Sequence, residues 1–364
     1  MNLKAFTFMF LLLLIALTGT TQKTESNKIA VIGYYAGNAE SVSAYPVEKL
    51  THIIFSFCHL KGNELSVDNL KDTLTIQRLV SLRERNPSLK VILSLGGWGG
   101  CETCSPVFAA KAGRKEFAKS VKKLNKYFKT DGIDLDWEYP SIPGFEGHQY
   151  TKDDKQNFTE LVKVLRKKLG RKNEISFAAG GFTKFLAESI DWAKVAPMVD
   201  KINLMTYDLV NGNSNLTGHH TPLYSTPQQI ESTDNAIHYL DSAGVPRNKM
   251  IIGAAFYGRI FDVEQDSLNG LYQKGKFNKG VSYKNLNVDS LKNEGFVSYW
   301  DDTAKAPYMY SSAKKQLLTF DDEKSIMLKT KYVVDNHLGG IMFWQLGEDK
   351  TSNGLLDAID KALH

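Results

Sequence analysis

The chain has 364 residues, of which 42% are hydrophobic and 23% are charged, and this balance excludes fibrous, collagen-like and disordered proteins. It is long enough to bury a large core, either as one barrel or as two ordinary domains. The formal net charge of +5 is mild. Lysines concentrate in segment 117–128, where Phe117, Val121 and Leu124 share one helix face, so these lysines fit a solvated helix surface and we expect no nucleic-acid partner.

The first feature in chain order is a secretory signal peptide, predicted for residues 1–20. Lys4 precedes an apolar run at 5–17, and small polar residues follow. The run is shorter than the ~20 residues that a membrane-spanning helix needs. We therefore expect the mature protein to be secreted, into the extracellular or periplasmic space, without membrane association after cleavage.

Eight short apolar runs rich in strand-forming residues follow along the chain. Helical periods are clearest at 117–128 and 158–169, between such runs. Apolar strands that alternate with helices predict a parallel sheet covered by helices, and eight such units predict an α/β fold, the (β/α)8 TIM barrel. A doubly wound open sheet is the alternative, but no G-x-G-x-x-G follows the first strand. The runs begin at Lys28, His52, Lys90, Gly132, Glu174, Lys201, Met250 and Gly339.

The interval between the seventh and eighth strands breaks the regular spacing. It is turn-rich and aromatic, and it has no long helical period before residue 320. We predict a small α+β insertion at 262–319, between strands 7 and 8. The barrel would then consist of residues 28–261 and 320–364.

The three cysteines are too few for a disulfide framework. Cys101 and Cys104 form a C-E-T-C pair that can close a small disulfide in an oxidising compartment, although the sequence leaves this pairing open. A zinc site would need a second pair of ligands. Cys58 follows an apolar strand, and we expect it to be buried.

The stretch DGIDLDWEYP, at 131–140, places Asp134, Asp136 and Glu138 at every second position. In a strand these carboxyls share one face, about 6.6 Å apart along the axis, so at least one pKa must be raised. We expect Asp134, the innermost, to stay protonated or to share a proton with Asp136. Glu138 at the rim would be a general acid.

A structural polar network and a divalent metal site are alternative interpretations of these acids. No His lies among the strand-end residues that would complete a metal site, so we predict no metal and no cofactor. Aromatic residues and carboxyls from many strand ends converge on the mouth of the predicted barrel. Such a mouth suits a sugar polymer, whose ring faces stack on aromatic rings.

These motifs resemble the family 18 glycoside hydrolases, the chitinases and their relatives. DGIDLDWEYP matches the D-G-x-D-x-D-x-E pattern of that family, and SLGGW at 94–98 matches its S-x-G-G strand. MTYD at 205–208, YGR at 257–259 and the late Trp344 match further elements. The resemblance spans essentially the whole mature chain, including the insertion.

The resemblance implies roles for the matched residues. Glu138 would protonate the glycosidic oxygen, and Asp136 would orient the acetamido group, whose oxygen is the nucleophile in this family. Asp134 would exchange a proton with Asp136, and Tyr207 would bond the acetamido carbonyl. The other implied positions hold Asp134 or line the substrate cleft: Tyr34, Phe57, Ser94, Trp98, Tyr139, Met205, Asp208, Tyr257, Arg259 and Trp344.

The implied function is that of a monomeric chitinase, which hydrolyses β-1,4 bonds between N-acetylglucosamine units in chitin or its oligosaccharides, with retention. One alternative is an endo-β-N-acetylglucosaminidase acting on N-glycans, against which the insertion argues because a wall beside the cleft suits a long linear chain. The other is a catalytically inactive chitin-binding lectin. Such lectins typically lose the acid at the position of Glu138, which this chain retains.

Two local expectations complete the prediction. Members of the family carry non-proline cis peptides at strand ends, and the matching bonds join Ser56 to Phe57, Glu138 to Tyr139, and Trp344 to Gln345. His219 and His220 follow the MTYD motif in a segment without aromatic residues, and we expect them to be turn residues.

Overall fold

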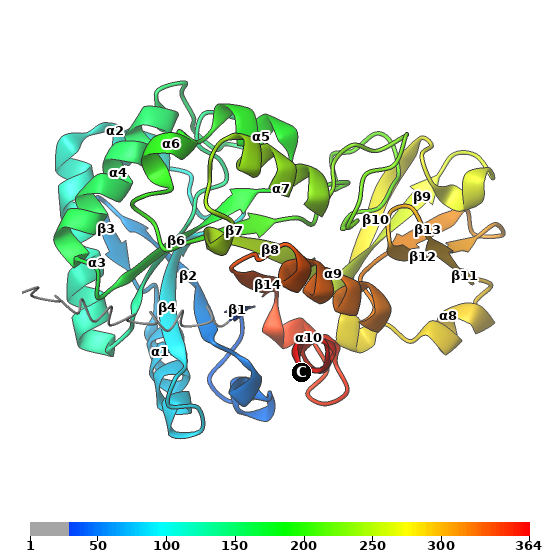
Figure 1. Ribbon diagram of the computed structural model, residues 1–364, viewed down its shortest axis with the longest axis horizontal. Helices are drawn as coiled ribbons and strands as arrows, with labels where there is room; N and C mark the ends of the chain where they lie inside the picture. The colour runs from blue at the N-terminus through cyan, green and yellow to red at the C-terminus, as the bar shows by residue number, and fades with distance from the viewer. Residues whose placement is uncertain (1–28) are drawn as a thin grey trace, which may run out of the picture.

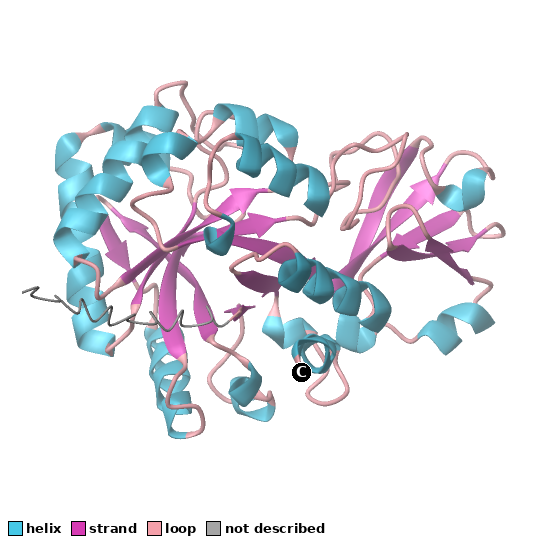
Figure 2. Cartoon of the chain, in the orientation of Figure 1, coloured by secondary structure: helices cyan, strands magenta, loops and turns pink. Residues whose placement is uncertain are grey.

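The computed structural model describes residues 29–364, so the predicted signal peptide lies outside the described residues. Eight parallel strands form a closed barrel (Figures 1 and 2). Strand β1 pairs with both β14 and β2, which closes the sheet and confirms the predicted TIM barrel. The barrel strands are β1 (Ala30–Tyr35), β2 (His52–Lys61), β4 (Lys90–Gly96), β5 (Gly132–Asp136), β6 (Glu174–Gly180), β7 (Lys201–Met205), β8 (Met250–Ala255) and β14 (Gly340–Trp344).

Helices cover the outside of the barrel, and the two periodic segments seen in the sequence are α3 and α4. In α3, Phe117 and Val121 are fully buried against the strands, while its lysines lie on the outer side. Each fully buried side chain of this size contributes about 1.5–3 kcal/mol. The helices are α1 (Leu70–Ser81), α2 (Cys104–Ala109), α3 (Lys111–Phe128), α4 (Asp154–Leu169), α5 (Thr183–Glu188), α6 (Trp192–Val195), α7 (Thr233–Ser242), α9 (Glu323–Asp335) and α10 (Leu355–Leu363).

The barrel has two apolar layers, and strand β5 faces both of them. Ile133 and Leu135 belong to the layer between strands and helices. The inner layer includes Tyr34 and Met342. Because alternate residues of a strand point to opposite faces, Asp134 points into the barrel.

The predicted insertion is present as a five-stranded antiparallel sheet beside the barrel (Figure 1), in the order β10-β9-β13-β12-β11. Its first strand begins at Tyr257, directly after β8, and therefore includes residues before position 262. In the barrel, β2 also pairs with a short antiparallel strand, β3 (Glu64–Ser66). The insertion contains β9 (Tyr257–Val263), β10 (Gly275–Ser282), α8 (Val288–Asn293), β11 (Val297–Asp301), β12 (Ala306–Ser311) and β13 (Gln316–Thr319).

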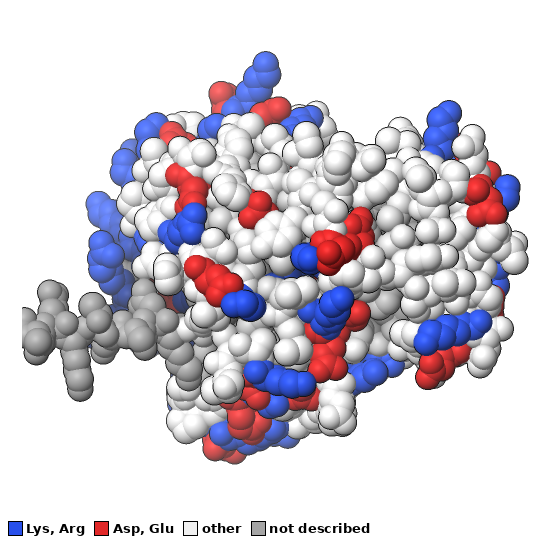
Figure 3. All heavy atoms as spheres, turned by 45° about the vertical axis from the view of Figure 1, so that its right-hand side comes forward, with Lys and Arg blue, Asp and Glu red and all other residues white. Residues whose placement is uncertain are grey.

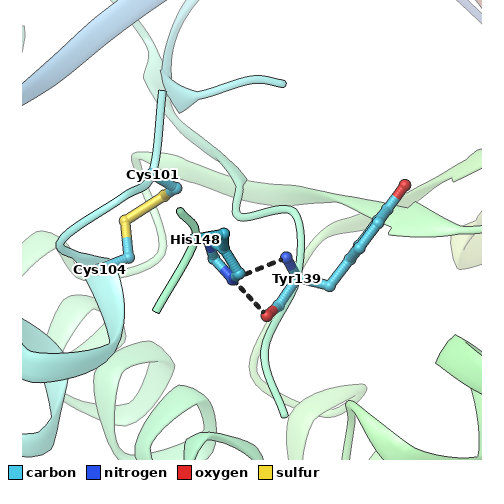
Figure 4. Close-up of a disulfide and its surroundings, with 4 residues drawn as sticks. All are labelled: Cys101, Cys104, Tyr139 and His148. Carbon is cyan, nitrogen blue, oxygen red and sulfur yellow. Dashed lines mark hydrogen bonds between the residues drawn. A yellow bond between two sulfur atoms is a disulfide. The ribbon is translucent and has the colours of Figure 1, made fainter. Parts of the chain in front are cut away.

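Cys101 and Cys104 form a disulfide at the start of α2 (Figure 4), and Cys58 is fully buried as expected. Within residues 29–364, no helix is both long and apolar enough to cross a membrane. On the face in Figure 3, acidic and basic side chains are intermingled and much of the surface is uncharged.

Candidate active site

The three acids of the DGIDLDWEYP stretch lie at the carboxyl end of β5. The strand ends at Asp136, so Glu138 stands two residues beyond it. Asp134, Asp136 and Glu138 are 0%, 4% and 9% exposed. Three carboxyls therefore share a nearly dry site, where full ionisation is costly.

Asp134 is the most completely hydrogen-bonded of these carboxyls. Tyr34 and Ser94 were predicted to hold it, whereas the partners from β6 and β7 were missed. The sequence feature that could have revealed both missed partners is a polar residue within an otherwise apolar strand. The four donors are Tyr34 Oη (3.1 Å) and Ser94 Oγ (2.8 Å) to Oδ2, and Ser176 Oγ (2.6 Å) and Asn203 Nδ2 (3.1 Å) to Oδ1.

This hydrogen-bond pattern favours the protonated form at Asp136 over that at Asp134. Burial raises the pKa of Asp134, but its four hydrogen bonds favour the ionised form. Burial raises the pKa of Asp136 well above its ordinary value, with the charges of Glu138 and Asp134 acting in the same direction. Oδ1 of Asp136 has no hydrogen-bond partner among residues 29–364. A proton shared by Asp134 and Asp136, as the sequence predicts, would therefore reside more on Asp136.

Glu138 has the electrostatics of a general acid near neutral pH. Burial raises its pKa to about 7, and the negative charge of Asp208 acts in the same direction. At that value about half of the molecules carry the proton at pH 7. The peptide bond from Glu138 to Tyr139 is cis, as are those from Ser56 to Phe57 and from Trp344 to Gln345, so all three predicted cis bonds are confirmed.

Tyr207 lies inside the barrel mouth, close to Met205 in the inner apolar layer. Its hydroxyl donates to Sδ of Met342 at 3.8 Å. A thioether is a weak acceptor, so this hydroxyl can turn to a carbonyl oxygen at little cost. Tyr257 packs edge-on against the Tyr207 ring, with the ring centres 6.2 Å apart.

Aromatic rings form the rest of the mouth. Trp344 stacks on Phe57, with ring centres 5.6 Å apart and planes 13° apart, and is 6.0 Å from the Tyr34 ring. Trp98 is 54% exposed and meets the Tyr139 ring edge-on at 6.3 Å. An exposed indole beside a buried acid can stack on a sugar ring.

The predicted residues Asp208 and Arg259 form an ion pair. Burial opposes ionisation of Asp208, but hydrogen bonds from His220 and Arg259 hold its pKa well below its ordinary value. The guanidinium also lies over the ring of Phe277, an insertion residue that was missed, at 5.1 Å. Asp208 is therefore a fixed negative charge beside the acids of β5.

His219 and His220 lie outside the helices and strands, with His220 at a bend, but both are fully buried. His219 Nε2 lies 3.0 Å from Asp301 Oδ2, and His220 Nδ1 lies 3.5 Å from Asp208 Oδ1. Their partners are distant in sequence, so the local pattern could not reveal these contacts. In the described part of the chain, no group of three or more His, Cys, Asp or Glu is arranged to hold a metal ion.

A family model described as "Glycosyl hydrolases family 18" matches residues 30–349. The chain belongs to this family. Its acid motif, its barrel and its insertion were the basis of the resemblance seen in the sequence, which is thereby confirmed.

Three relatives illustrate the range of this family. Chitinase A1 of Niallia circulans is 35% identical over 300 residues, which are 76% of this chain and 43% of that protein. The oviduct-specific glycoprotein of Mus musculus is 30% identical over 316 residues, 82% of this chain and 43% of that protein. This chain thus spans less than half the length of both.

The third relative is a solved structure, a family 18 N-acetylglucosaminidase from Paenibacillus barengoltzii. It has a TM-score of 0.82 and 33% sequence identity, and the match covers 92% of this chain and 99% of that one. The three relatives carry three different names. The choice among family 18 activities therefore depends on the chemistry of this site.

Proposed function

We propose that the protein is a chitinase that hydrolyses β-1,4 linkages between N-acetylglucosamine units with retention, using the acetamido group of the substrate as the nucleophile. The observation that carries this proposal is the set of carboxyls at the end of β5. Glu138 bears a proton near neutral pH, and Asp136 beside it is held protonated. One carboxyl can thus act as the acid while its neighbour holds the acetamido group.

The first step divides the work between the substrate and the two acids. The acetamido carbonyl oxygen attacks the anomeric carbon, the bond to the leaving oxygen breaks, and Glu138 gives that oxygen its proton. An oxazolinium ion forms. The proton of Asp136 moves to Asp134, and the resulting Asp136 carboxylate stabilises the positive charge on the oxazolinium nitrogen. Tyr207 donates its hydroxyl to the group as it reacts.

The second step restores the enzyme. The Glu138 carboxylate takes a proton from water, and the resulting hydroxide opens the oxazolinium at the anomeric carbon. Two displacements at the same carbon retain the β configuration. The proton then returns from Asp134 to Asp136, because the four hydrogen bonds donated to Asp134 favour its ionised form.

The position of the acids supports the substrate as nucleophile. A protein nucleophile would approach the sugar from the face opposite the acid, with the two carboxyls about 5–5.5 Å apart. Asp136 and Glu138 instead stand side by side, and Asp208 at the end of β7 is engaged by Arg259. The tethered acetamido oxygen has an entropic advantage over an external nucleophile.

Trp344 would support the sugar ring at the cleavage point, with Phe57 and Tyr34 fixing the indole from behind. Trp98 and the other lining residues would extend the contact with chitin oligosaccharides. We further propose that the protein acts as a secreted monomer outside the cytoplasm. The Cys101–Cys104 disulfide supports export, since such bonds persist in oxidising compartments.

The test follows product formation from a hexamer of N-acetylglucosamine by NMR, beside an N-linked glycopeptide and a glucosamine hexamer. We expect the acetylated hexamer to give β-anomer products first and the glucosamine hexamer to be inert. Early α-anomer products, or efficient cleavage of the glucosamine hexamer, would rule out the mechanism. Release of glycan from the glycopeptide alone would favour the endo-β-N-acetylglucosaminidase.

The control variant Glu138→Gln keeps the shape of the side chain but cannot transfer the proton. Turnover should fall by at least ~100-fold, the low end for general acid catalysis, while oligosaccharide affinity is kept. A wild-type protein that binds the hexamer but hydrolyses it at no pH would be a lectin.

A further inference from the structure

The loop between β5 and α4, residues 137–153, folds back over the peptide bond that follows the catalytic acid. A Cβ on Gly144 would lie 2.1 Å from the carbonyl oxygen of Glu138, so the main chain of Gly144 packs directly on this peptide. His148 approaches from the same loop, and its Nε2 lies 3.1 Å from the Tyr139 nitrogen and 2.8 Å from the Tyr139 oxygen (Figure 4). One imidazole nitrogen thus contacts both polar main-chain groups of Tyr139.

A single imidazole nitrogen is either a donor or an acceptor, depending on where the ring carries its proton. With the proton on Nδ1, His148 Nε2 accepts the Tyr139 N–H; with the proton on Nε2, it donates to the Tyr139 carbonyl. In either tautomer, His148 is hydrogen-bonded to the main chain of Tyr139, the residue directly after Glu138. A side chain with no polar atom at this point could hold neither group.

The loop itself is anchored, so the histidine is a firm support. The His148 ring stacks on Tyr150, with planes 8° apart and ring centres 6.4 Å apart. Asp154, at the start of α4, is fully buried and accepts hydrogen bonds from Thr151 N (2.7 Å) and Ser105 Oγ (2.7 Å). The loop is therefore tied to α2 at its far end.

The ring of Tyr139 is fixed independently of its main chain. It packs edge-on against Phe182 and Phe185, at 5.5 and 5.6 Å between ring centres. These apolar contacts position the ring but bond neither the N–H nor the carbonyl. The contacts of Gly144 and His148, in contrast, are made directly with the main chain beside Glu138.

We propose that His148 is a positioning residue for the catalytic acid: by bonding the main chain of Tyr139, it fixes the Glu138 carboxyl at proton-transfer distance from the glycosidic oxygen. The proposal rests on the proposed function, since it assigns the acid role to Glu138. Misplacement of a reacting group by about 1 Å can cost ~100-fold in rate. Loss of the histidine should therefore reduce turnover while leaving the sugar-stacking surfaces intact.

The kinetic test compares His148→Phe, which keeps a flat ring without nitrogen, with His148→Gln, whose amide can accept or donate. Gln149→Ala, an exposed neighbour, is the matched control. We expect His148→Phe to lower kcat about 10- to 100-fold with KM changed less than about 3-fold. His148→Gln should recover most of the loss, and Gln149→Ala should match wild type. Wild-type kcat in His148→Phe, or a loss that His148→Gln fails to rescue, would overturn the proposal.

A second measurement needs no turnover, so it separates this proposal from the proposed function. Amide hydrogen exchange at Tyr139, followed by NMR on protein labelled with [15N]tyrosine, should be at least ~10-fold faster in His148→Phe than in wild type or Gln149→Ala. Faster exchange in a protein without hydrolytic activity would support the contact between His148 and Tyr139 and would refute the proposed chitinase activity. Unchanged exchange, together with an unchanged carbonyl 13C chemical shift of Tyr139, would refute the contact with His148, whatever the activity.

Discussion

Replacing Glu138 by Gln should stabilise the folded protein at neutral and alkaline pH, because it removes a carboxyl whose ionisation the fold resists. Glu138 is 9% exposed, and burial raises its pKa from 4.5 to about 7. The pKa of Asp136 should fall as well, since the charge of Glu138 is one cause of its increase. The variant therefore relieves electrostatic repulsion in the site and removes the proton of the proposed acid.

The sign and size of this change in stability follow from the linkage between proton binding and folding. Below about pH 4.5, Glu138 is protonated in both the folded and the unfolded chain, and its contribution to stability is fully present. As pH rises towards 7, the unfolded chain releases the proton while the folded chain keeps it, and stability falls by about 1.4 kcal/mol per pH unit. The loss is complete once the folded carboxyl ionises, above about pH 7, and is on the order of 3 kcal/mol.

The assay is urea unfolding, followed by tryptophan fluorescence at pH 5, 7 and 9, of wild type, Glu138→Gln and Glu146→Gln. Glu146 is an exposed acid on the same loop, so its variant reports the effect of charge removal alone. The stability gain of Glu138→Gln over wild type should grow by about 2–3 kcal/mol from pH 5 to pH 9. A gain that is constant within 0.5 kcal/mol (roughly the error of the method) would refute the electrostatic reasoning.

Two further predictions concern the same charges. The rate constant kcat/KM of the wild type should fall about tenfold per pH unit above about pH 7, as Glu138 loses its proton, and a flat profile up to pH 9 would contradict its role as the acid. Arg259→Met should reduce the free energy of unfolding by about 1–3 kcal/mol, because the charge of Asp208 would then lack the guanidinium that pairs with it. Adding Asp208→Asn should recover much of that loss in urea unfolding, and an additive double variant would show that the pair is uncoupled.

The barrel could be predicted from the sequence because its signals are local. Each apolar strand and each amphipathic helix, such as α3, is visible within a short window of residues. The start of the insertion was harder to predict from the sequence, because β8 and β9 are both apolar and are separated by one residue, Phe256. Their different partners, β7 and β14 for one and β10 and β13 for the other, are set by the fold.

In the candidate active site, too, local features could be predicted from the sequence and long-range contacts could not. The spacing of Asp134, Asp136 and Glu138 revealed an acid cluster, because a strand alternates its faces over a few residues. The location of the proton depends on Ser176 and Asn203, which lie 42 and 69 residues further along the chain and reach Asp134 through neighbouring strands. Hydrogen bonds between distant segments leave no periodic trace in the sequence.

The route of β9 makes the insertion inseparable from the barrel. This strand carries Arg259, which is paired on one side with Gly280 and on the other with Thr319, so the counter-ion of Asp208 is held by the sheet of the insertion. Exchange of this region as a cassette, whether by recombination or by protein engineering, would have to carry a matching guanidinium in the same register. The barrel and the insertion are therefore coupled through a single ion pair, between Asp208 and Arg259.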